Sequence, residues 1–276
     1  MSFAEQLDNL LTLNGLVSLL TLTLLEIVLG IDNIIFISII AGKVQSPEDR
    51  KKARSIGLLL ALLMRIALLF GITWIIGLTK PIFELTGLIS FFQGMGLEHP
   101  VEAAKVTGRD LILFCGGVFL LAKTTSEIHE KIDMADDTDE EKKLNIATVS
   151  SVIMQIVFID IIFSFDSILT AVGIVNEVLI MIAAVVVSMA IMMIFSGKVA
   201  RFIDEHPTVK MLALAFLLMI GFLLILESFD IHVPKPYVYS SMAFAFLVEL
   251  LNMRLRKRSA ARRTAKKSQQ SQENLN

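Results

Sequence analysis

Two short motifs place acidic residues inside long apolar segments of this chain. In each motif an acid is followed, after five apolar or small residues, by an aspartate and then by a small polar residue. The residues are Glu26, Asp32 and Asn33 in the first motif and Asp160, Asp166 and Ser167 in the second. Carboxylate, amide and hydroxyl oxygens suit hard divalent cations, so the motifs predict a metal site for Mn²⁺, Mg²⁺ or Ca²⁺.

The histidines argue against softer metals at this site. None of the four lies within a predicted span, since all are placed in loops or near the membrane interface (His99, His129, His206 and His232). Zinc, copper and nickel sites use imidazole or thiolate, which makes these metals poor candidates. An acid that is not holding a metal can titrate, so proton coupling stays open.

Burying four acids in a membrane requires compensation. Each acid costs roughly 2.5–3.5 kcal/mol at the bilayer centre on insertion scales, so we expect all four to face the bundle interior. The structural alternative is simple pairing with Arg65, the one basic residue inside a predicted span. One arginine cannot neutralise four acids. Because Arg65 and Asp32 should lie at a similar depth, we expect Arg65 to act as a counter-ion that neutralises Asp32 when no cation is bound and yields when a cation arrives. The alternative is a permanent ion pair.

Helical spacing decides which of these oxygens share a face. Positions seven apart fall on nearly one stripe at about 100° per residue, which aligns Glu26 with Asn33 and Asp160 with Ser167. The second aspartate of each motif lies about 120° away on a straight helix. A kink at Gly30 or near Ser164 would bring both aspartates to the same cavity.

The elements that carry these motifs belong to a membrane protein. Of the 276 residues, 55% are hydrophobic and 19% are charged, and the mean hydropathy is +0.72. Soluble domains are about 45–50% apolar and about 25% charged, so a soluble globular enzyme, a disordered chain and a disulfide-rich domain are all disfavoured. Cys115 is the only cysteine. We therefore expect an all-α polytopic membrane protein.

Seven continuous apolar segments have the length of membrane-spanning helices, which takes roughly 20 residues each. They cover residues 14–41, 55–79, 109–123, 149–172, 177–196, 210–227 and 237–253. Alternate loops hold 20 basic residues on one side and 4 on the other. By the positive-inside rule, the N-terminus is predicted outside and the C-terminus in the cytoplasm.

The two motifs indicate an inverted 3+3 repeat followed by one extra helix. Three helices separate them, so the second copy enters the membrane from the opposite side, as in many secondary transporters. We expect one transmembrane domain over residues 1–253 and a basic cytoplasmic tail over 254–276. Within the domain, repeat one covers about 14–123, repeat two about 149–227, and the extra helix 237–253.

Several stretches resemble the TerC family of bacterial integral membrane proteins. They read LTLLEIVLGIDNIIFISI, DIIFSFDSILTAVG, HPTVKMLALAFLLMIGF and LILESFDIHVPKPY, and the resemblance runs from about residue 14 to 253. The likeness is strongest to the small members that lack cytoplasmic regulatory domains. It implies a multi-pass protein of the bacterial inner membrane, whose family is associated by name with tellurium resistance. It also implies Mn²⁺, because several members are linked to Mn²⁺ export and to metal supply for exported proteins.

We therefore expect a divalent-cation transporter that exports Mn²⁺, without a prosthetic group and without enzyme activity. Its partners would be the cation and the lipid bilayer, and not nucleic acid. One alternative is a non-transporting membrane partner that supplies metal to exported metalloproteins or the secretion machinery through the 82–108 loop. A remote alternative is an intramembrane aspartyl protease using Asp32 and Asp166, although the Gly-x-Gly-Asp motif of such enzymes is missing. Direct handling of tellurite fits poorly with a cavity of carboxylates.

Overall fold

The computed structural model describes most of the chain. It leaves out residues 1–8, 72–75, 95–100, 102–103, 137–146, 176, 232 and 274–276, and the side chains at 31–32, 88, 91–92, 134–136, 166, 173–174, 257 and 259–273. The chain divides into two compact units, Met1–His232 and Val233–Asn276, and each is described by itself.

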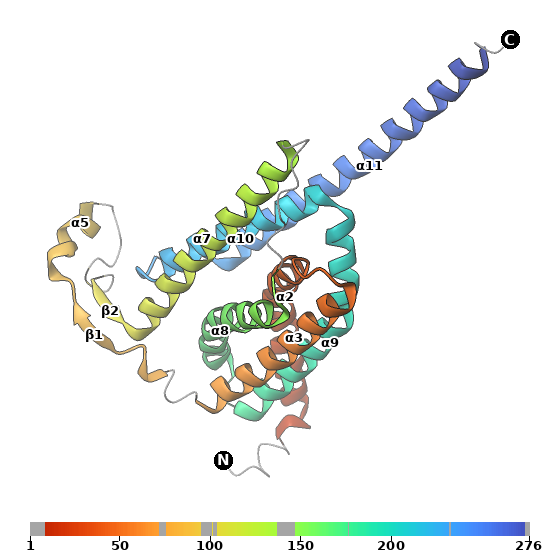
Figure 1. The fold of residues 1–276 in the computed structure, drawn as a ribbon. Helices are drawn as coiled ribbons and strands as arrows, with labels where there is room; N and C mark the ends of the chain where they lie inside the picture. Colours follow the sequence, from red (N-terminus) through yellow and green to blue (C-terminus); the bar gives the residue numbers. More distant parts are fainter. Residues whose placement is uncertain are drawn as a thin grey trace. The chain divides into compact units, whose positions relative to one another are not determined.

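Long helices dominate the first unit, and a short antiparallel ribbon interrupts them (Figure 1). Its elements are α2 (Leu13–Ala41), α3 (Pro47–Phe70), β1 (Pro81–Glu84), η1 (Thr86–Leu88), α5 (Ile89–Gly94), β2 (Lys105–Thr107), α7 (Gly108–Asp136), α8 (Val149–Ile174), α9 (Val178–Glu205) and α10 (Pro207–Glu227). The second unit holds one helix, α11 (Lys235–Glu273).

The predicted number of spans is confirmed for the described part of the chain. Seven helices there are long and apolar enough to cross a membrane, namely α2, α3, α7, α8, α9, α10 and α11. The orientation of the chain and the inverted repeat stay predictions.

Several helices extend beyond the apolar runs that predicted them. The helix α3 begins at Pro47 rather than near residue 55, and its first turn carries Glu48 and Asp49. Proline at the first helical position and acids in the first turn both favour a helix start there. Apolar length alone misses such charged turns, because only the membrane-embedded part of a helix must be apolar.

Threonine caps fix the starts of the two helices that carry the acidic motifs. The Thr12 hydroxyl accepts a hydrogen bond from Gly15 N at the start of α2, and Thr148 accepts one from Ser151 N at the start of α8. Each cap satisfies one of the amide groups that a helix start leaves unpaired. The motifs therefore lie at a defined distance from a capped helix end.

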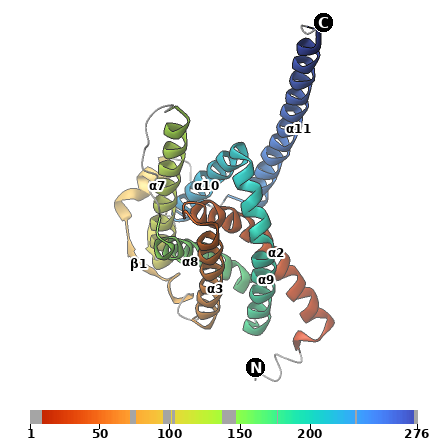
Figure 2. The same ribbon diagram turned by 45° about the vertical axis from the view of Figure 1, so that its right-hand side comes forward.

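The helices α2, α3, α8 and α9 contribute most of the apolar core of the first unit, and α7 and α10 add a few residues to it. The helix α2 packs most closely on α9, and α3 packs most closely on α8 (Figures 1 and 2). The core between these helices includes the buried rings of Phe36 and Phe165. The remaining pair, α7 and α10, pack mainly on each other.

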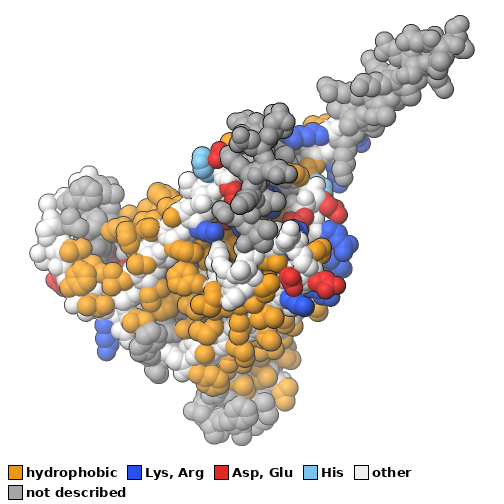
Figure 3. Space-filling view, in the orientation of Figure 1, with side chains coloured by type: hydrophobic (Ala, Val, Ile, Leu, Met, Phe, Trp, Pro, Cys, Tyr) orange, Lys and Arg blue, Asp and Glu red, His pale blue; other side chains and the backbone are white. Residues whose placement is uncertain are grey.

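The outward faces of the helices are also apolar. Leu20 of α2 is 61% exposed and Leu63 of α3 is 54% exposed, and hydrophobic side chains cover much of the face shown in Figure 3. An apolar surface of this extent is unfavourable in water but favourable against lipid. The surface therefore agrees with the seven candidate spans.

A short antiparallel ribbon and two short helices connect α3 to α7. The strands β1 and β2 pair with Phe83 opposite Val106, and η1 and α5 lie between them in the chain. The pairing needs the distant segment 105–107, which the local pattern of residues 82–96 does not reveal.

Two glycines let α7 and α10 approach closely. A Cβ atom at Gly117 would lie 2.7 Å from the Gly221 carbonyl oxygen, and one at Gly221 would lie 3.2 Å from the Gly117 carbonyl oxygen. Small residues at a helix crossing allow this backbone contact in membrane proteins.

We expect Gly117→Ala to destabilise the protein, because the added methyl group would force α7 and α10 apart. Overpacking of this kind costs about 1–3 kcal/mol. Thermal unfolding of the purified protein in detergent measures the loss. The matched control is Gly87→Ala, whose Cβ meets nothing within 4 Å. Equal melting temperatures for both variants would contradict the close crossing.

Candidate functional site

Three charged side chains meet inside the helix bundle of the first unit. Glu26 of α2, Arg65 of α3 and Asp160 of α8 are each 3% exposed. They come from helices whose packing on one another builds the core. Their meeting satisfies the rule that a charge buried in apolar surroundings must be paired.

Arg65 is shared between the two carboxylates. Its Nη1 donates to Glu26 Oε2 at 2.6 Å. Its Nη2 donates to Asp160 Oδ1 at 2.7 Å and its Nε donates to Asp160 Oδ2 at 3.0 Å. The contact with Asp160 is therefore bidentate, and the contact with Glu26 uses one bond. Bidentate arginine–carboxylate pairs are the stronger and more directional kind.

Neutral polar groups complete the surroundings of Asp160. Ser164 Oγ donates to Asp160 Oδ2 at 3.1 Å, and Asn33 Nδ2 donates to Asp160 Oδ1 at 3.4 Å. Asn33 Oδ1 is buried and has no hydrogen-bond partner among the described residues. Ser167 Oγ donates to the Ser164 carbonyl at 3.2 Å and lies beside Glu26. A buried, unpaired carbonyl oxygen costs free energy unless a ligand or water meets it.

The structure thus brings five of the predicted residues into one cluster. Four are candidate ligands and the fifth is the counter-ion: Glu26, Asn33, Asp160, Ser167 and Arg65. Ser164, which the sequence analysis considered only as the place of a kink, joins them as a partner of Asp160. Its position four residues after Asp160, one turn along the helix, was the available signal.

The side chains of Asp32 and Asp166 lie outside the described residues. The helices α2 and α8 are continuous through Gly30 and Ser164. A Cβ at Gly30 would lie 2.6 Å from Met192 Sδ, so this glycine makes room for α9.

Arg65 has two acidic partners among the described residues. Its guanidinium contacts Glu26 and Asp160. We expected Arg65 to neutralise Asp32, from their similar depth in the membrane. Because the Asp32 side chain lies outside the described residues, that pairing stays a prediction.

A small cavity adjoins Glu26. It holds about 10 Å³, and the residues around it are apolar except for the carboxylate, among them Leu22, Leu69 and Met181. This volume is roughly that needed for one water molecule. The carboxylate of Glu26 is therefore next to a space from which a small ion or water could reach it.

The described residues do not form a complete metal centre. Among them, no group of three or more His, Cys, Asp or Glu side chains could hold a metal ion. Two carboxylates, an amide oxygen and a hydroxyl are suitable oxygen donors, but the guanidinium occupies the space between the carboxylates. A cation could bind both acids only after Arg65 moves.

A second charged cluster, not foreseen from the sequence, lies beyond the C-terminal end of α2. Lys43 Nζ contacts Glu127 at 2.6 Å and Glu130 at 2.8 Å, and Lys123 contacts Glu127 at 3.1 Å. Burial would lower the pKa of Lys43, but hydrogen bonds to Glu127 and Glu130 outweigh it and raise that pKa above its usual value. The cluster links the loop after α2 to α7, and only the i,i+4 spacing of Lys123 and Glu127 signalled part of it.

Comparison with known proteins gives consistent matches along the chain. Residues 11–264 match the profile described as Integral membrane protein TerC family. The UPF0053 inner membrane protein YgdQ of Escherichia coli (strain K12) is 46% identical over 240 residues, covering 87% of this chain and 93% of the relative. A UPF0053 protein of Haemophilus influenzae is 44% identical, with coverages of 87% and 94%.

A longer relative matches the same region. The UPF0053 inner membrane protein YoaE of Escherichia coli (strain K12) is 45% identical over 234 residues, which cover 85% of this chain but 42% of the relative. No solved structure matches the chain.

We expect Arg65→Gln to lower the free energy of unfolding by about 3–5 kcal/mol in metal-free protein, because it leaves two buried carboxylates without a counter-charge. Chemical denaturation in detergent measures this loss. Lys52→Gln is the control, because Lys52 is exposed and its ion pair with exposed Asp49 is long, at 3.8 Å. The loss of such a pair should change stability little. Combining Arg65→Gln with Glu26→Gln and Asp160→Asn should restore most of the stability. A triple variant no more stable than Arg65→Gln would contradict the pairing.

Proposed function

This chain belongs to the TerC family of integral membrane proteins, and on that premise we propose that it exports divalent metal ions, Mn²⁺ in particular. It is a multi-pass inner-membrane protein. The names of its relatives give the inner membrane, and the seven apolar helices of the described residues are long enough to cross it. The observation that carries the proposal is the buried meeting of Glu26 and Asp160 around one guanidinium. Ionisable residues at membrane depth mark ion pathways in most proteins that have them.

The proposed ligands are oxygen atoms from both acidic motifs. Glu26 and Asp160 supply carboxylates, Asn33 and Ser167 supply neutral oxygens, and Asp32 and Asp166 complete the set. The unpaired Asn33 Oδ1 supports this assignment, because it is a buried acceptor beside Asp160. Oxygen donors alone do not separate Mn²⁺ from Mg²⁺ or Ca²⁺. The family resemblance is what favours Mn²⁺.

Arg65 has the role of a tethered counter-ion in this proposal. With Arg65 in place, the described triad carries one net negative charge, so the bundle tolerates the carboxylates without a metal. A divalent ion next to a guanidinium would be repelled at close range. Loading of the ion therefore requires Arg65 to leave Asp160, and unloading lets it return. This exchange keeps the switching role that the sequence suggested for Arg65 and assigns it to the described partners Glu26 and Asp160.

The helix packing supports an inverted repeat. If α2, α3 and α7 correspond to α8, α9 and α10, then the pairing of α2 with α9 corresponds to that of α8 with α3. Exchanging the two repeats also exchanges α7 with α10, so the packing of these two helices on each other is unchanged by the exchange. Glu26 and Asp160 occupy equivalent positions in this scheme, and Arg65 bridges them near the pseudo-two-fold axis. Rocking of the two repeats about this axis would give alternating access.

The direct test is ion flux in proteoliposomes that contain the purified protein. We expect Mn²⁺ flux in the wild type and its loss in Glu26→Gln, Asp160→Asn, Asp32→Asn and Asp166→Asn. Glu84→Gln is the matched control, because this exposed carboxylate of β1 lies outside the cluster. Parallel assays with Mg²⁺ and Ca²⁺ define selectivity, and two pH values show whether protons are coupled.

Other outcomes of the flux assay would redirect the proposal. Tight Mn²⁺ binding without flux would support the alternative of a membrane partner that hands metal to exported proteins. Neither binding nor flux would leave the carboxylates with a structural role, and the transporter proposal would then be wrong.

We expect Arg65→Gln to bind Mn²⁺ at least about tenfold more tightly than the wild type, since the guanidinium no longer competes for the carboxylates; tenfold corresponds to about 1.4 kcal/mol. Titration calorimetry measures the affinity. Added Mn²⁺ should also raise the melting temperature of this variant more than that of Lys52→Gln, because binding stabilises the folded state. Unchanged or weaker affinity in Arg65→Gln would show that Arg65 does not compete with the ion.

A further inference from the structure

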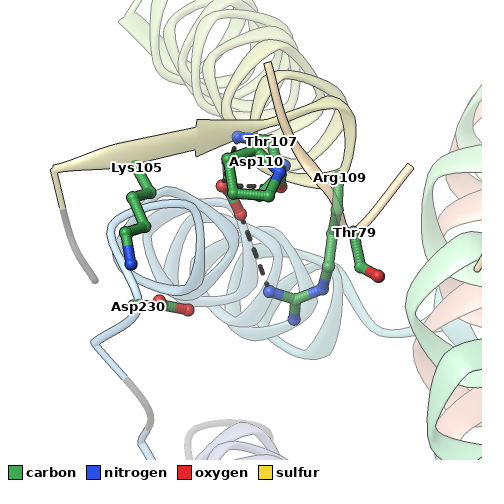
Figure 4. Close-up of a pocket in the computed structure, with 7 residues that line it drawn as sticks. Thr79, Lys105, Thr107, Arg109, Asp110 and Asp230 are labelled. Atoms are coloured by element: carbon green, nitrogen blue, oxygen red, sulfur yellow. Dashed lines mark hydrogen bonds and ion pairs between the residues drawn. The ribbon is translucent and has the colours of Figure 1, made fainter. Parts of the chain in front are cut away.

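A cavity of about 290 Å³ lies at the end of the first unit where α7 begins (Figure 4). It is built by three segments that are distant in the sequence: the approach to β1, the β2–α7 junction and the turn after α10. Its polar lining consists of Thr79, Lys105, Thr107, Arg109, Asp110 and Asp230. Small-molecule sites usually start at about 300 Å³, so the cavity suits a compact polar ligand.

Hydrogen bonds hold the β2–α7 wall of the cavity in place. Thr107 N and Oγ1 donate to Asp110 Oδ2 at 2.9 and 2.7 Å, and Asp110 N donates to Thr107 Oγ1 at 3.2 Å. This reciprocal pattern is a capping box at the start of α7. Arg109 N also donates to the Leu78 carbonyl at 3.1 Å. Lys105 and Arg109 therefore extend from a fixed backbone.

The opposite wall holds an aspartate in an unusual backbone conformation. Asp230 has φ of 56°, the one positive value outside glycine among the described residues. Its amide donates to the Glu227 carbonyl at 3.2 Å, and Ile231 N donates to the Leu226 carbonyl at 3.1 Å. These bonds form a Schellman motif at the end of α10, in which glycine is the usual residue at the left-handed position.

The use of aspartate here has a cost that glycine would avoid. A left-handed backbone disfavours residues with a Cβ by roughly 1–2 kcal/mol, although aspartate tolerates it better than most. Strain of this kind is commonly kept where the side chain has a function. The Asp230 carboxylate lines the cavity, with Lys105 beside it and Arg109 further along the wall (Figure 4).

The charges of the lining select a ligand that carries both signs. Lys105 and Arg109 attract an anion. Asp110 Oδ2 is used by the capping box, and Asp110 Oδ1 lies 3.8 Å from Arg109 Nη1. Asp230 adds a second carboxylate to the lining, beside Lys105 (Figure 4). A purely anionic ligand would face Asp230, and a purely cationic one would face Lys105 and Arg109. A phosphate joined to a primary ammonium group satisfies both sides.

The surroundings of the cavity place it at a lipid interface. It lies at the first residue of α7 and just past the last residue of α10, where two candidate spans end. Large apolar side chains nearby are exposed, including Ile82 at 63%, Phe83 at 46% and Leu111 at 44%. Acyl chains could lie against these side chains while a headgroup enters the cavity.

We propose that this cavity binds the phosphoethanolamine headgroup of a zwitterionic phospholipid. The phosphate is held by Lys105 and Arg109, and the ammonium group is held by Asp230. The same chemistry exists in soluble phosphoethanolamine, and the lipid is the favoured source because of the apolar rim. This inference is independent of metal transport, so it does not depend on the role assigned to Glu26 and Asp160.

Thermal unfolding of the full chain in detergent, with short-chain phospholipids added, tests the proposal. We expect phosphatidylethanolamine to stabilise the wild type more than phosphatidylcholine, whose ammonium has no N–H, and more than anionic phosphatidylglycerol. Lys105→Gln with Arg109→Gln should weaken phosphatidylethanolamine binding about tenfold or more. Lys80→Gln is the control, because Lys80 is an exposed cation next to the cavity but outside its lining.

Asp230→Gly separates folding from binding. Because glycine suits the left-handed position, the lipid-free variant should still fold and unfold cooperatively, while the preference for phosphatidylethanolamine is lost. Asp230→Asn should also lose the preference, since it keeps the shape without the charge. Soluble phosphoethanolamine should compete with the lipid, and inorganic phosphate should compete less.

Three outcomes would overturn the proposal. One is stabilisation by phosphatidylglycerol or by inorganic phosphate equal to that by phosphatidylethanolamine, which would indicate a plain anion site. Another is an unchanged lipid preference in Asp230→Gly and Asp230→Asn. The third is stabilisation by phosphatidylethanolamine that persists unaltered without Lys105 and Arg109.

Discussion

One guanidinium shared by two carboxylates is the constraint on which the rest of the first unit depends. Arg65 lies between Glu26 and Asp160, and all three are buried. Because none of these charges can remain unpaired in an apolar interior, the three helices must keep the register at which the side chains meet. The apolar core could tolerate small sliding movements between helices, whereas a directional bidentate contact allows far less.

Charged residues at each level of the molecule are compensated locally. The middle has the Arg65 triad, the loop after α2 has Lys43 with Glu127 and Glu130, and the start of α7 has the polar cavity. Between these levels, most of the buried side chains are apolar, with a few serines and threonines among them. This arrangement is expected where little water is available to solvate a misplaced charge. It also means that a change at one level need not disturb the others.

The sequence predicts the parts of this structure that depend on local patterns. Seven apolar runs predicted the seven candidate spans, and the two acidic motifs predicted Glu26 and Asp160 at one site. The contacts of Arg65 with Glu26 and Asp160 were not predictable from depth alone, because the angular position of each carboxylate also matters. Lys43 and Glu130 are 87 residues apart, and β1 needs β2 to form. Such long-range contacts leave no local signal, so their absence from the sequence analysis has a physical cause.

The small cavity next to Glu26 has a consequence for selectivity. The cavity has room for about one water molecule. An ion that reached Glu26 through this cavity would therefore have to lose most of its hydration shell. Ions differ in how readily they do this, and Mg²⁺ gives up water reluctantly. An ion using this route would also meet Glu26, which Arg65 holds by one bond, before Asp160, which it holds by two. Dehydration in this narrow apolar cavity, rather than the donor atoms themselves, would then separate ions of equal charge.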